Sequence, residues 1–218
     1  RGVIPPLLTP FTSGGERLDE GALRAHAQWL VARGIHGMMA CGTTGEMALM
    51  EAAERRRVLE VIVAAAGGRV PVLAQVGAAS TRETVELARH ACDAGADALS
   101  VVTPYYYHLP DAALVAHYCR VAEAVPDMPI YLYNIPWNTG NTISPAVAEE
   151  VTARCPNVVG IKDSAGDLPA LLAFTRVNGS RFQVVCGSDA LILCALQGGA
   201  CASVSGNAGV FPEIVVAL

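Results

Sequence analysis

Eight short apolar segments recur along the 218 residues, and a longer amphipathic stretch separates each of them from the next. The apolar segments are Val3–Leu8, Ile35–Cys41, Val70–Val76, Ala96–Val102, Pro129–Tyr133, Val158–Lys162, Phe182–Cys186 and Ala200–Val204. Several are continuously apolar and rich in Val and Ile, which is typical of parallel strands covered on both faces. The stretches with helical spacing are Asp19–Arg33, Glu51–Ala66, Thr81–Ala94, Asp111–Ala124, Ser144–Ala153, Asp167–Arg176 and Ala190–Gln197.

This alternation predicts an α/β fold in which eight parallel strands close into a (β/α)8 barrel, the TIM barrel. We expect residues 1–218 to form this single barrel domain. A doubly wound open sheet is the alternative, but no GxGxxG motif follows the first strand. Phe211-Pro212-Glu213 begins an eighth helix, and the sequence stops inside the apolar face of that helix at Leu218. We therefore expect a barrel truncated at the start of its eighth helix.

Composition excludes several classes of function. The formal net charge is −5 and the charges are scattered, so nucleic acid is not an expected partner. No apolar run reaches about 18 residues, and the first residues lack the pattern of a signal peptide, so neither a membrane span nor secretion is expected. The seven cysteines are odd in number and form no CxxC, which suits buried thiols in a reducing cytoplasm. The histidines show no metal-ligand spacing, so no metal is predicted.

Lys162 is the only lysine in the sequence, and every other cationic side chain is arginine. It ends an apolar segment that begins at Val158. A neutral primary amine can attack a carbonyl group and form a Schiff base, which a guanidinium cannot do. A low-dielectric barrel interior favours the neutral amine, and Asp163 points to the opposite face of the strand because side chains alternate. The alternative is an ordinary strand-end lysine that reaches water or forms an ion pair.

Polar side chains follow most of the predicted strands, at the end of the barrel where sites of this architecture are built. They include the segments Cys41–Glu46, Thr103–Tyr107, Tyr133–Pro136, Lys162–Ser164, Cys186–Asp189 and Ser203–Asn207. A tyrosine close to the lysine could transfer protons during imine chemistry. The Gly42-Thr43-Thr44-Gly45 turn offers hydroxyl and amide groups to a carboxylate, although a helix cap and turn is the alternative.

Two further groups at these strand ends allow other interpretations. Tyr105, Tyr106 and Tyr107 could serve packing or a subunit interface as well as catalysis. Cys41 and Cys186 also end strands, but no histidine lies near them in the sequence to activate a thiol. A thiol nucleophile is therefore the weaker interpretation.

Four motifs in this order, GTTGE, TPYYY, YNIP and GIKDS, resemble the dihydrodipicolinate synthase / N-acetylneuraminate lyase family. The opening GVIPPLLTPF is similar to it as well, so the resemblance covers essentially the whole chain. It implies a pyruvate-dependent class I aldolase or lyase on a TIM barrel, with no cofactor beyond the covalent imine. Members are usually homotetramers with extra C-terminal helices, which this chain lacks. We therefore expect a cytoplasmic homo-oligomer, a dimer or tetramer, acting on a small 2-oxo acid and an aldehyde.

The resemblance also implies roles for individual residues. Lys162 would form the Schiff base, and Tyr133 would transfer protons. Thr43 would link Tyr133 to Tyr106 of a neighbouring subunit. The residues expected to bind the 2-oxo acid or the aldehyde are Thr44, Asn138, Gly187 and Ala202.

The sequence departs from the family at the positions that select the aldehyde. Dihydrodipicolinate synthases carry an arginine two residues after the YNxP proline, and here that residue is Asn138, which cannot pair with a carboxylate in the same way. Sialic acid lyases carry a glutamate where Ala190 follows Asp189. These departures favour an aldolase for 2-keto-3-deoxy sugar acids or 4-hydroxy-2-oxo acids. Trp137 could narrow the pocket or simply pack in the loop.

Four alternatives remain open. The chain could be a dihydrodipicolinate synthase (4-hydroxy-tetrahydrodipicolinate synthase) or a deoxy-sugar-acid dehydratase. It could instead be a non-catalytic relative that binds a 2-oxo acid, although such a relative would be expected to lose Lys162 or Tyr133. A phosphate-binding barrel with an anion loop at 206–209 is weaker still.

Overall fold

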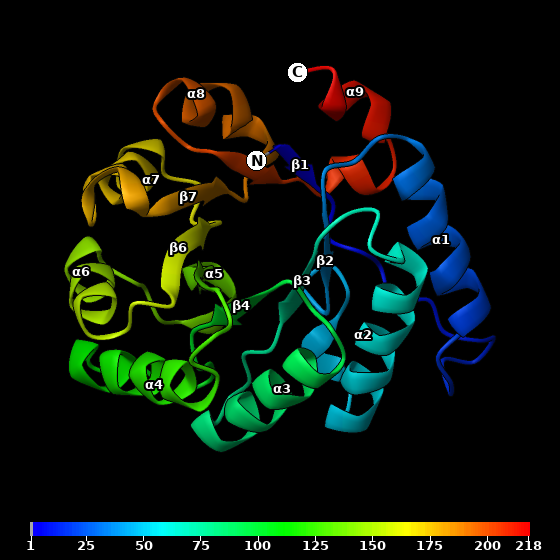
Figure 1. The fold of residues 1–218 in the computed structure, drawn as a ribbon, viewed down its shortest axis with the longest axis horizontal. Coiled ribbons are helices and arrows are strands. Elements are labelled where there is room, and N and C mark those ends of the chain that lie inside the picture. The colour runs from blue at the N-terminus through cyan, green and yellow to red at the C-terminus, as the bar shows by residue number, and fades with distance from the viewer. Residues whose placement is uncertain (1) are drawn as a thin grey trace.

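The computed structural model describes residues 2–218, apart from the side chain of Ser180, and contains one eight-stranded parallel sheet (Figure 1). The strands are β1 (Gly2–Ile4), β2 (Met38–Ala40), β3 (Val72–Gln75), β4 (Ala98–Val102), β5 (Ile130–Asn134), β6 (Val158–Asp163), β7 (Gln183–Cys186) and β8 (Ala202–Val204). Their order in the sheet is β1-β8-β7-β6-β5-β4-β3-β2, so each strand lies beside its neighbours in sequence. The predicted TIM barrel is confirmed.

The ring of strands closes between β1 and β2 through the residues that follow β1. Pro6 forms an isolated parallel bridge with Met39. The amide of Met39 donates to the carbonyl of Pro5 at 3.0 Å, and the amide of Leu7 donates to the carbonyl of Met39 at 2.9 Å. These two bonds continue the ladder around the barrel and leave it nearly closed.

Helices form the outer layer and alternate with the strands (Figure 1). The α-helices are α1 (Glu20–Ala32), α2 (Ala52–Ala66), α3 (Thr81–Asp93), α4 (Asp111–Ala124), α5 (Pro136–Thr139), α6 (Pro145–Arg154), α7 (Leu168–Ala173), α8 (Ile192–Gln197) and α9 (Pro212–Val216). The short helix α5 was not predicted, and the stretch predicted as a helix over 167–176 ends as the 3-10 turn η2 (Phe174–Arg176). None of the helices among residues 2–218 is long and apolar enough to cross a membrane.

Local sequence explains where several helices begin. The side chain of Asp19 accepts a hydrogen bond from the amide of Ala22 at the start of α1. Ser144 caps α6 in the same way, with Pro145 at the first helical position. Such caps satisfy amides that have no partner inside the helix, and proline has no amide to satisfy.

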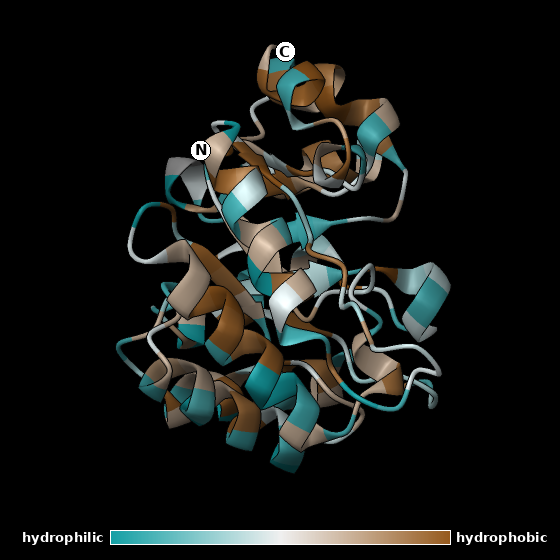
Figure 2. Ribbon diagram, turned by 90° about the vertical axis from the view of Figure 1, so that its right-hand side faces the viewer, coloured by the Kyte–Doolittle hydropathy of each residue, from teal (hydrophilic) through white to brown (hydrophobic). Residues whose placement is uncertain are grey.

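Hydrophobic side chains fill the space between the strands and the helices, where one cluster includes residues from nearly every element. Figure 2 shows the helices coloured brown on some turns and teal on others, as expected for helices that cover a core with one face. Inside the barrel, Val102, Tyr133, Lys162, Val185 and Ala202 lie side by side on β4 to β8. Register therefore brings residues far apart in sequence into one layer.

Candidate active site

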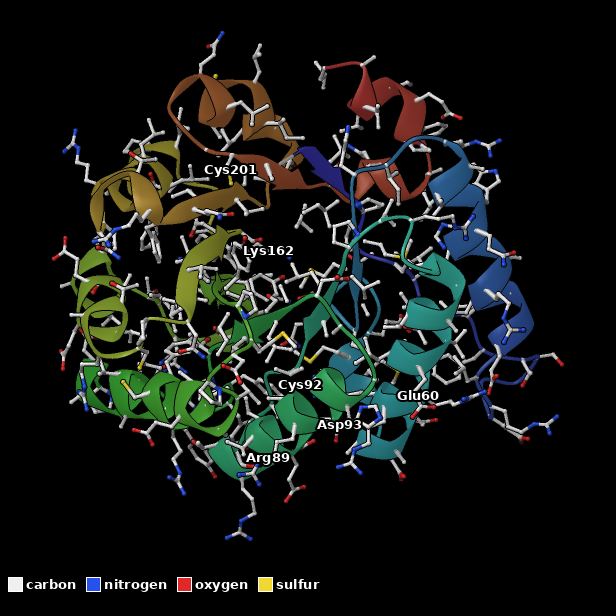
Figure 3. All side chains as sticks on the ribbon, viewed as in Figure 1. Glu60, Arg89, Cys92, Asp93, Lys162 and Cys201 are labelled. Atoms are coloured by element: carbon white, nitrogen blue, oxygen red, sulfur yellow. The ribbon has the colours of Figure 1, made fainter. Side chains whose placement is uncertain are left out.

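Lys162 is buried inside the barrel, with 4% of its surface exposed. Its Nζ lies 3.6 Å from the Sδ atom of Met39 on β2, four strands away around the ring, so the side chain crosses the interior. Figure 3 shows Lys162 within the ring of strands and away from the labelled charged residues Glu60, Arg89 and Asp93. No ion pair found among the described residues includes it. The interpretation of Lys162 as a solvated or ion-paired strand-end lysine therefore does not fit the structure.

Tyr133 lies beside Lys162 because β5 and β6 pair these two residues in register. The Nζ atom is 3.7 Å from the centroid of the Tyr133 ring. The Tyr133 hydroxyl forms a hydrogen bond of 3.0 Å with the Thr43 hydroxyl, in the turn after β2. An amine, a phenol and an alcohol thus form a chain of polar groups in a largely apolar interior.

The surroundings of Tyr133 change the ionisation of its phenol. Burial opposes the loss of the proton, but the positive charge of Lys162 and its contact with the phenol favour the phenolate. Hydrogen bonding to Thr43 and Ser164 acts in the same direction, and the net result is a pKa of Tyr133 below its usual value. A phenol with a lowered pKa transfers protons near neutral pH more readily than an ordinary tyrosine.

Ser164 is a member of this group that the sequence reasoning did not select. It follows β6, is half-buried, and contacts the Tyr133 phenol. A side chain added at Gly187 would overlap the Ser164 Oγ atom, so the glycine leaves the space that this hydroxyl occupies. The only signal in the sequence was its position two residues after Lys162, and that position alone did not place it beside Tyr133.

A cavity of about 250 Å³ lies at the C-terminal ends of the strands, next to Thr43. This size is near the lower end of small-molecule sites. Its lining consists of Thr43, Glu46, Met47, Ala48, Leu49, Val102, Tyr105, Ile135, Asn138 and Thr139. Asn138 belongs to α5 and is exposed at this cavity, as is Glu46, the one carboxylate side chain among the described lining residues. No arginine or lysine lines it among the described residues.

Lys162 lines a second cavity, of about 140 Å³, together with Ala202. Most of the other walls come from the N-terminal ends of the strands, such as Val72, Ala98 and Gln183. Tyr133 lies between the two cavities, because its hydroxyl binds Thr43 in the wall of the first and its ring contacts Lys162 in the wall of the second. Of the predicted residues, Thr43 and Asn138 therefore line the first cavity, and Lys162 and Ala202 line the second.

Thr44, Gly187 and Tyr106 occupy different positions around this group. Thr44 is exposed in the turn next to Thr43, and Gly187 is half-buried where β7 ends. Tyr106 has a positive φ of 83° and is 85% exposed, stacked edge-on against Tyr107 with ring centroids 4.9 Å apart. It forms no hydrogen bond with Thr43 of its own chain among those that the described residues make.

The two thiols at the strand ends, Cys41 and Cys186, do not suit catalysis. Burial raises the pKa of Cys41 to about 11, and burial also raises the pKa of Cys186. Such thiols are mostly protonated at neutral pH and are weak nucleophiles. Within residues 2–218, no group of three or more His, Cys, Asp or Glu side chains is placed to hold a metal ion.

Comparison with known proteins places the chain in a family. The sequence profile of the Dihydrodipicolinate synthetase family matches residues 1–218. The chain belongs to this family. It is 40% identical over 215 residues to a 4-hydroxy-tetrahydrodipicolinate synthase of Methanopyrus kandleri, covering 99% of this chain and 71% of the relative. It is 43% identical over 217 residues to an uncharacterized DapA-like lyase of Halobacterium salinarum, covering 100% of this chain and 70% of the relative.

A solved structure adds to these matches. The structure of YagE from Escherichia coli K12 in complex with pyruvate superposes with a TM-score of 0.95 at 33% identity, covering 99% of this chain and 73% of that chain. Members of the Dihydrodipicolinate synthetase family are class I pyruvate-dependent lyases, for which a Schiff-base lysine is characteristic. The chain is accordingly an aldolase or lyase of this family, and the resemblance drawn from its motifs is confirmed.

Proposed function

We propose that Lys162 is the Schiff-base residue, and that it condenses with pyruvate or another 2-oxo acid. The observation that carries the proposal is the contact of the single, buried lysine with Tyr133, 3.7 Å from the ring centroid, and of the Tyr133 hydroxyl with Thr43 at 3.0 Å. In the neutral state the amine attacks C2 of the 2-oxo acid, and one water leaves as the imine forms. The protonated imine then accepts electrons from the adjacent carbon–carbon bond.

The reaction that follows is an aldol cleavage or its reverse. When a 4-hydroxy-2-oxo acid is bound, the C4 hydroxyl proton passes to the Tyr133 phenolate as the C3–C4 bond breaks, an aldehyde leaves and an enamine stays on Lys162. The enamine carbon takes a proton that Tyr133 delivers, and water then releases pyruvate. Thr43 orients the Tyr133 hydroxyl, and Ser164 contributes a second hydrogen bond to it. Thr44, Gly187 and Ala202 are proposed to surround the 2-oxo acid.

We infer that the aldehyde is uncharged and hydroxylated, like the aldehyde that is released when a 2-keto-3-deoxy sugar acid or a 4-hydroxy-2-oxo acid is cleaved. The cavity beside Thr43 contains the amide of Asn138 and the carboxylate of Glu46, but no cationic side chain among its described lining residues. An aldehyde with its own carboxylate would meet Glu46 without a compensating partner. Hydroxyl groups can hydrogen-bond both to an amide and to a carboxylate.

4-Hydroxy-tetrahydrodipicolinate synthase is the second candidate, because the relative from Methanopyrus kandleri carries that name. That reaction joins pyruvate to an aldehyde that carries a carboxylate. Asn138 stands where a cation would be expected to bind it. Comparing pyruvate condensation with aspartate semialdehyde and with glyceraldehyde separates the two candidates, because the first proposal requires faster turnover of the uncharged aldehyde.

The experiment that tests the Schiff base is reductive trapping. Borohydride added with pyruvate should reduce the imine, and mass mapping should find the adduct on Lys162. Lys162→Arg keeps a cation inside the barrel but cannot form an imine, so it should give no adduct. A wild-type protein that gives no adduct with pyruvate would disprove the proposal.

We further propose that a second copy of the chain completes the site with its Tyr106. Tyr106 and Tyr107 are 85% and 73% exposed and contact each other edge to face, and exposed apolar patches commonly mark an interface between proteins. The exposed Tyr106 is available to a neighbour in a way that the buried Tyr133 is not.

A further inference from the structure

Asn134 and Asp163 form the pair of residues that follows Tyr133 and Lys162 in the β5–β6 register. Because side chains alternate along a strand, Tyr133 and Lys162 point into the barrel while Asn134 and Asp163 point outward to the helices. Both outward side chains are buried, at 2% and 1% exposure. A polar pair thus lies directly behind the two residues of the proposed chemistry.

The contacts of this pair connect three strands and one loop. The Asn134 Nδ2 donates to the Asp163 Oδ1 at 2.6 Å, and the Asn134 Oδ1 accepts from the amide of Ile143 at 3.0 Å, in the segment before α6. The backbone contributes as well, since the amide of Ser164 donates to the carbonyl of Asn134 at 2.8 Å. The amide of Gly187 donates to the carbonyl of Asp163 at 2.7 Å and joins β7 to the same point.

Burying this polar pair between two strands is energetically unfavourable. Burial raises the pKa of Asp163, against the effects of its hydrogen bonds from Asn134 and from the amide of Ala165. The Asp163 Oδ2 is buried without a hydrogen-bond partner, and no salt bridge among the described residues includes this carboxylate. Packed apolar residues at such a position would stabilise a fold as well or better. Stability alone therefore does not account for the pair.

We propose that Asn134 and Asp163 are positioning residues, whose outward hydrogen bond holds β5 against β6 so that Tyr133 stays in reach of the Lys162 amine. The inference rests on the proposed role of Lys162 and Tyr133. Directional bonds fix the relative height of the strands more narrowly than apolar packing does. A displacement of about 1 Å in a reacting pair can lower a rate by about 100-fold.

The reaction used for the test needs only pyruvate. When Lys162 forms the imine, one C3 proton leaves to give the enamine, and in D2O the carbon takes back a deuteron. The proton NMR signal of the pyruvate methyl group then decreases at a rate that reports imine formation and proton transfer together. Measurement over a range of pyruvate concentrations separates kcat from KM.

The most informative variants exchange the side chains of Asn134 and Asp163, first singly and then together. Asn134→Asp puts two carboxyl groups against each other and should lower kcat by about 100-fold with little change in KM. Asp163→Asn leaves two amide side chains that can still form a hydrogen bond, so it should lower kcat by less than Asn134→Asp does. Asn134→Asp combined with Asp163→Asn restores one donor and one acceptor, so kcat should return to within about threefold of wild type.

Two further variants separate positioning from folding. Asn134→Leu combined with Asp163→Leu removes both polar side chains but leaves the buried amide of Ile143 without its acceptor, so the unfolding free energy should fall by roughly 1–3 kcal/mol. The kcat of the folded variant should fall as well. Asn157→Leu is the control, because Asn157 precedes the other end of β6 and donates to the carbonyls of Ala122, Val125 and Met128. It should lower the unfolding free energy and leave the kcat of the folded protein unchanged.

The outcomes distinguish this inference from the proposed function. If the wild-type protein gives neither a borohydride adduct with pyruvate nor exchange of the pyruvate methyl protons, the proposed role of Lys162 itself is wrong. A wild type that exchanges pyruvate, with a folded leucine pair at unchanged kcat, would overturn only the positioning role. Failure of the exchanged pair to recover activity, when it melts at the wild-type temperature, would also overturn it.

Discussion

At the residue scale, the chemistry depends on how Tyr133 is held between an amine and an alcohol. The Tyr133 side chain is 1% exposed, and its hydroxyl has a directed partner in Thr43. Tyr133→Phe keeps the ring against Lys162 but removes the proton. Pyruvate exchange should therefore fall by about 100-fold or more, within the range of general acid–base effects. Wild-type exchange by the folded variant would contradict the role of Tyr133.

The hydrogen bond between Thr43 and Tyr133 leads to a separate prediction about the pH dependence of the rate. Its hydrogen bond helps to lower the pKa of Tyr133, so Thr43→Val should raise that pKa. The limb of the pH–rate profile that depends on the Tyr133 phenol should then move to higher pH, with a smaller loss of rate than in Tyr133→Phe. Thr44→Val, one residue away, is the matched control, because Thr43 and not Thr44 forms the hydrogen bond with Tyr133, and its pH–rate profile should keep its position. An unshifted profile in Thr43→Val would contradict this argument.

At the scale of elements, His117 links α4 to the start of α3. Its Nδ1 lies 2.9 Å from the Thr81 hydroxyl, and burial lowers the pKa of His117 to about 4. The unfolded chain has a histidine pKa of about 6.5, so between these values the unfolded state binds more protons. Stability is therefore fully present above about pH 6.5 and decreases as the pH falls toward 4.

The expected size of this effect is about 2 kcal/mol of unfolding free energy lost by pH 5. Urea unfolding between pH 7 and pH 5 measures it. His117→Gln keeps a polar partner for Thr81 but has no charge to gain, so its unfolding free energy should change less over this range. Equal slopes for the two proteins would show that His117 does not cause the acid sensitivity.

Gly160 shows how one strand position controls packing between β6 and β7. A side chain there would overlap the carbonyl of Gln183 and the ring of Tyr131. Gly160→Ala should therefore destabilise the fold by roughly 1–3 kcal/mol, as overpacking does. Gly21→Ala in α1 meets only an ordinary contact with Asp19 and should stabilise by up to about 1 kcal/mol. Urea unfolding of the two variants compares them directly.

At the scale of the whole molecule, the proposed sharing of Tyr106 can be tested by mixing inactive subunits. In a twofold dimer, a chain with Tyr106→Phe and a chain with Lys162→Ala together rebuild one intact site. Random mixing should then recover about a quarter of the wild-type activity from two nearly inactive proteins. No recovery in mixtures shown by native mass spectrometry to contain mixed dimers would contradict the arrangement.

The barrel and its strand order followed from the alternation of apolar segments, since buried parallel strands are apolar on both faces and short loops join neighbours. Helix boundaries were less predictable. The short helix α5, which begins at Pro136, makes a contact with a distant loop through the bond from the Trp137 Nε1 to the carbonyl of Ala165. The change to a 3-10 turn at Phe174 was not signalled by the sequence pattern either.

The sequence alone determined the family and singled out Lys162, because a lone lysine in an apolar strand and four ordered motifs are local properties of the chain. Only the tertiary structure decided what that lysine touches. The β5–β6 register brings Tyr133 beside Lys162, and Met39 on β2 meets the amine from across the barrel. Thr43, in the turn after β2, is connected to this pair through the Tyr133 hydroxyl. The same register places Asn134 and Asp163 back to back with Tyr133 and Lys162. Because register depends on how whole strands pack, no single segment of the sequence contains this arrangement.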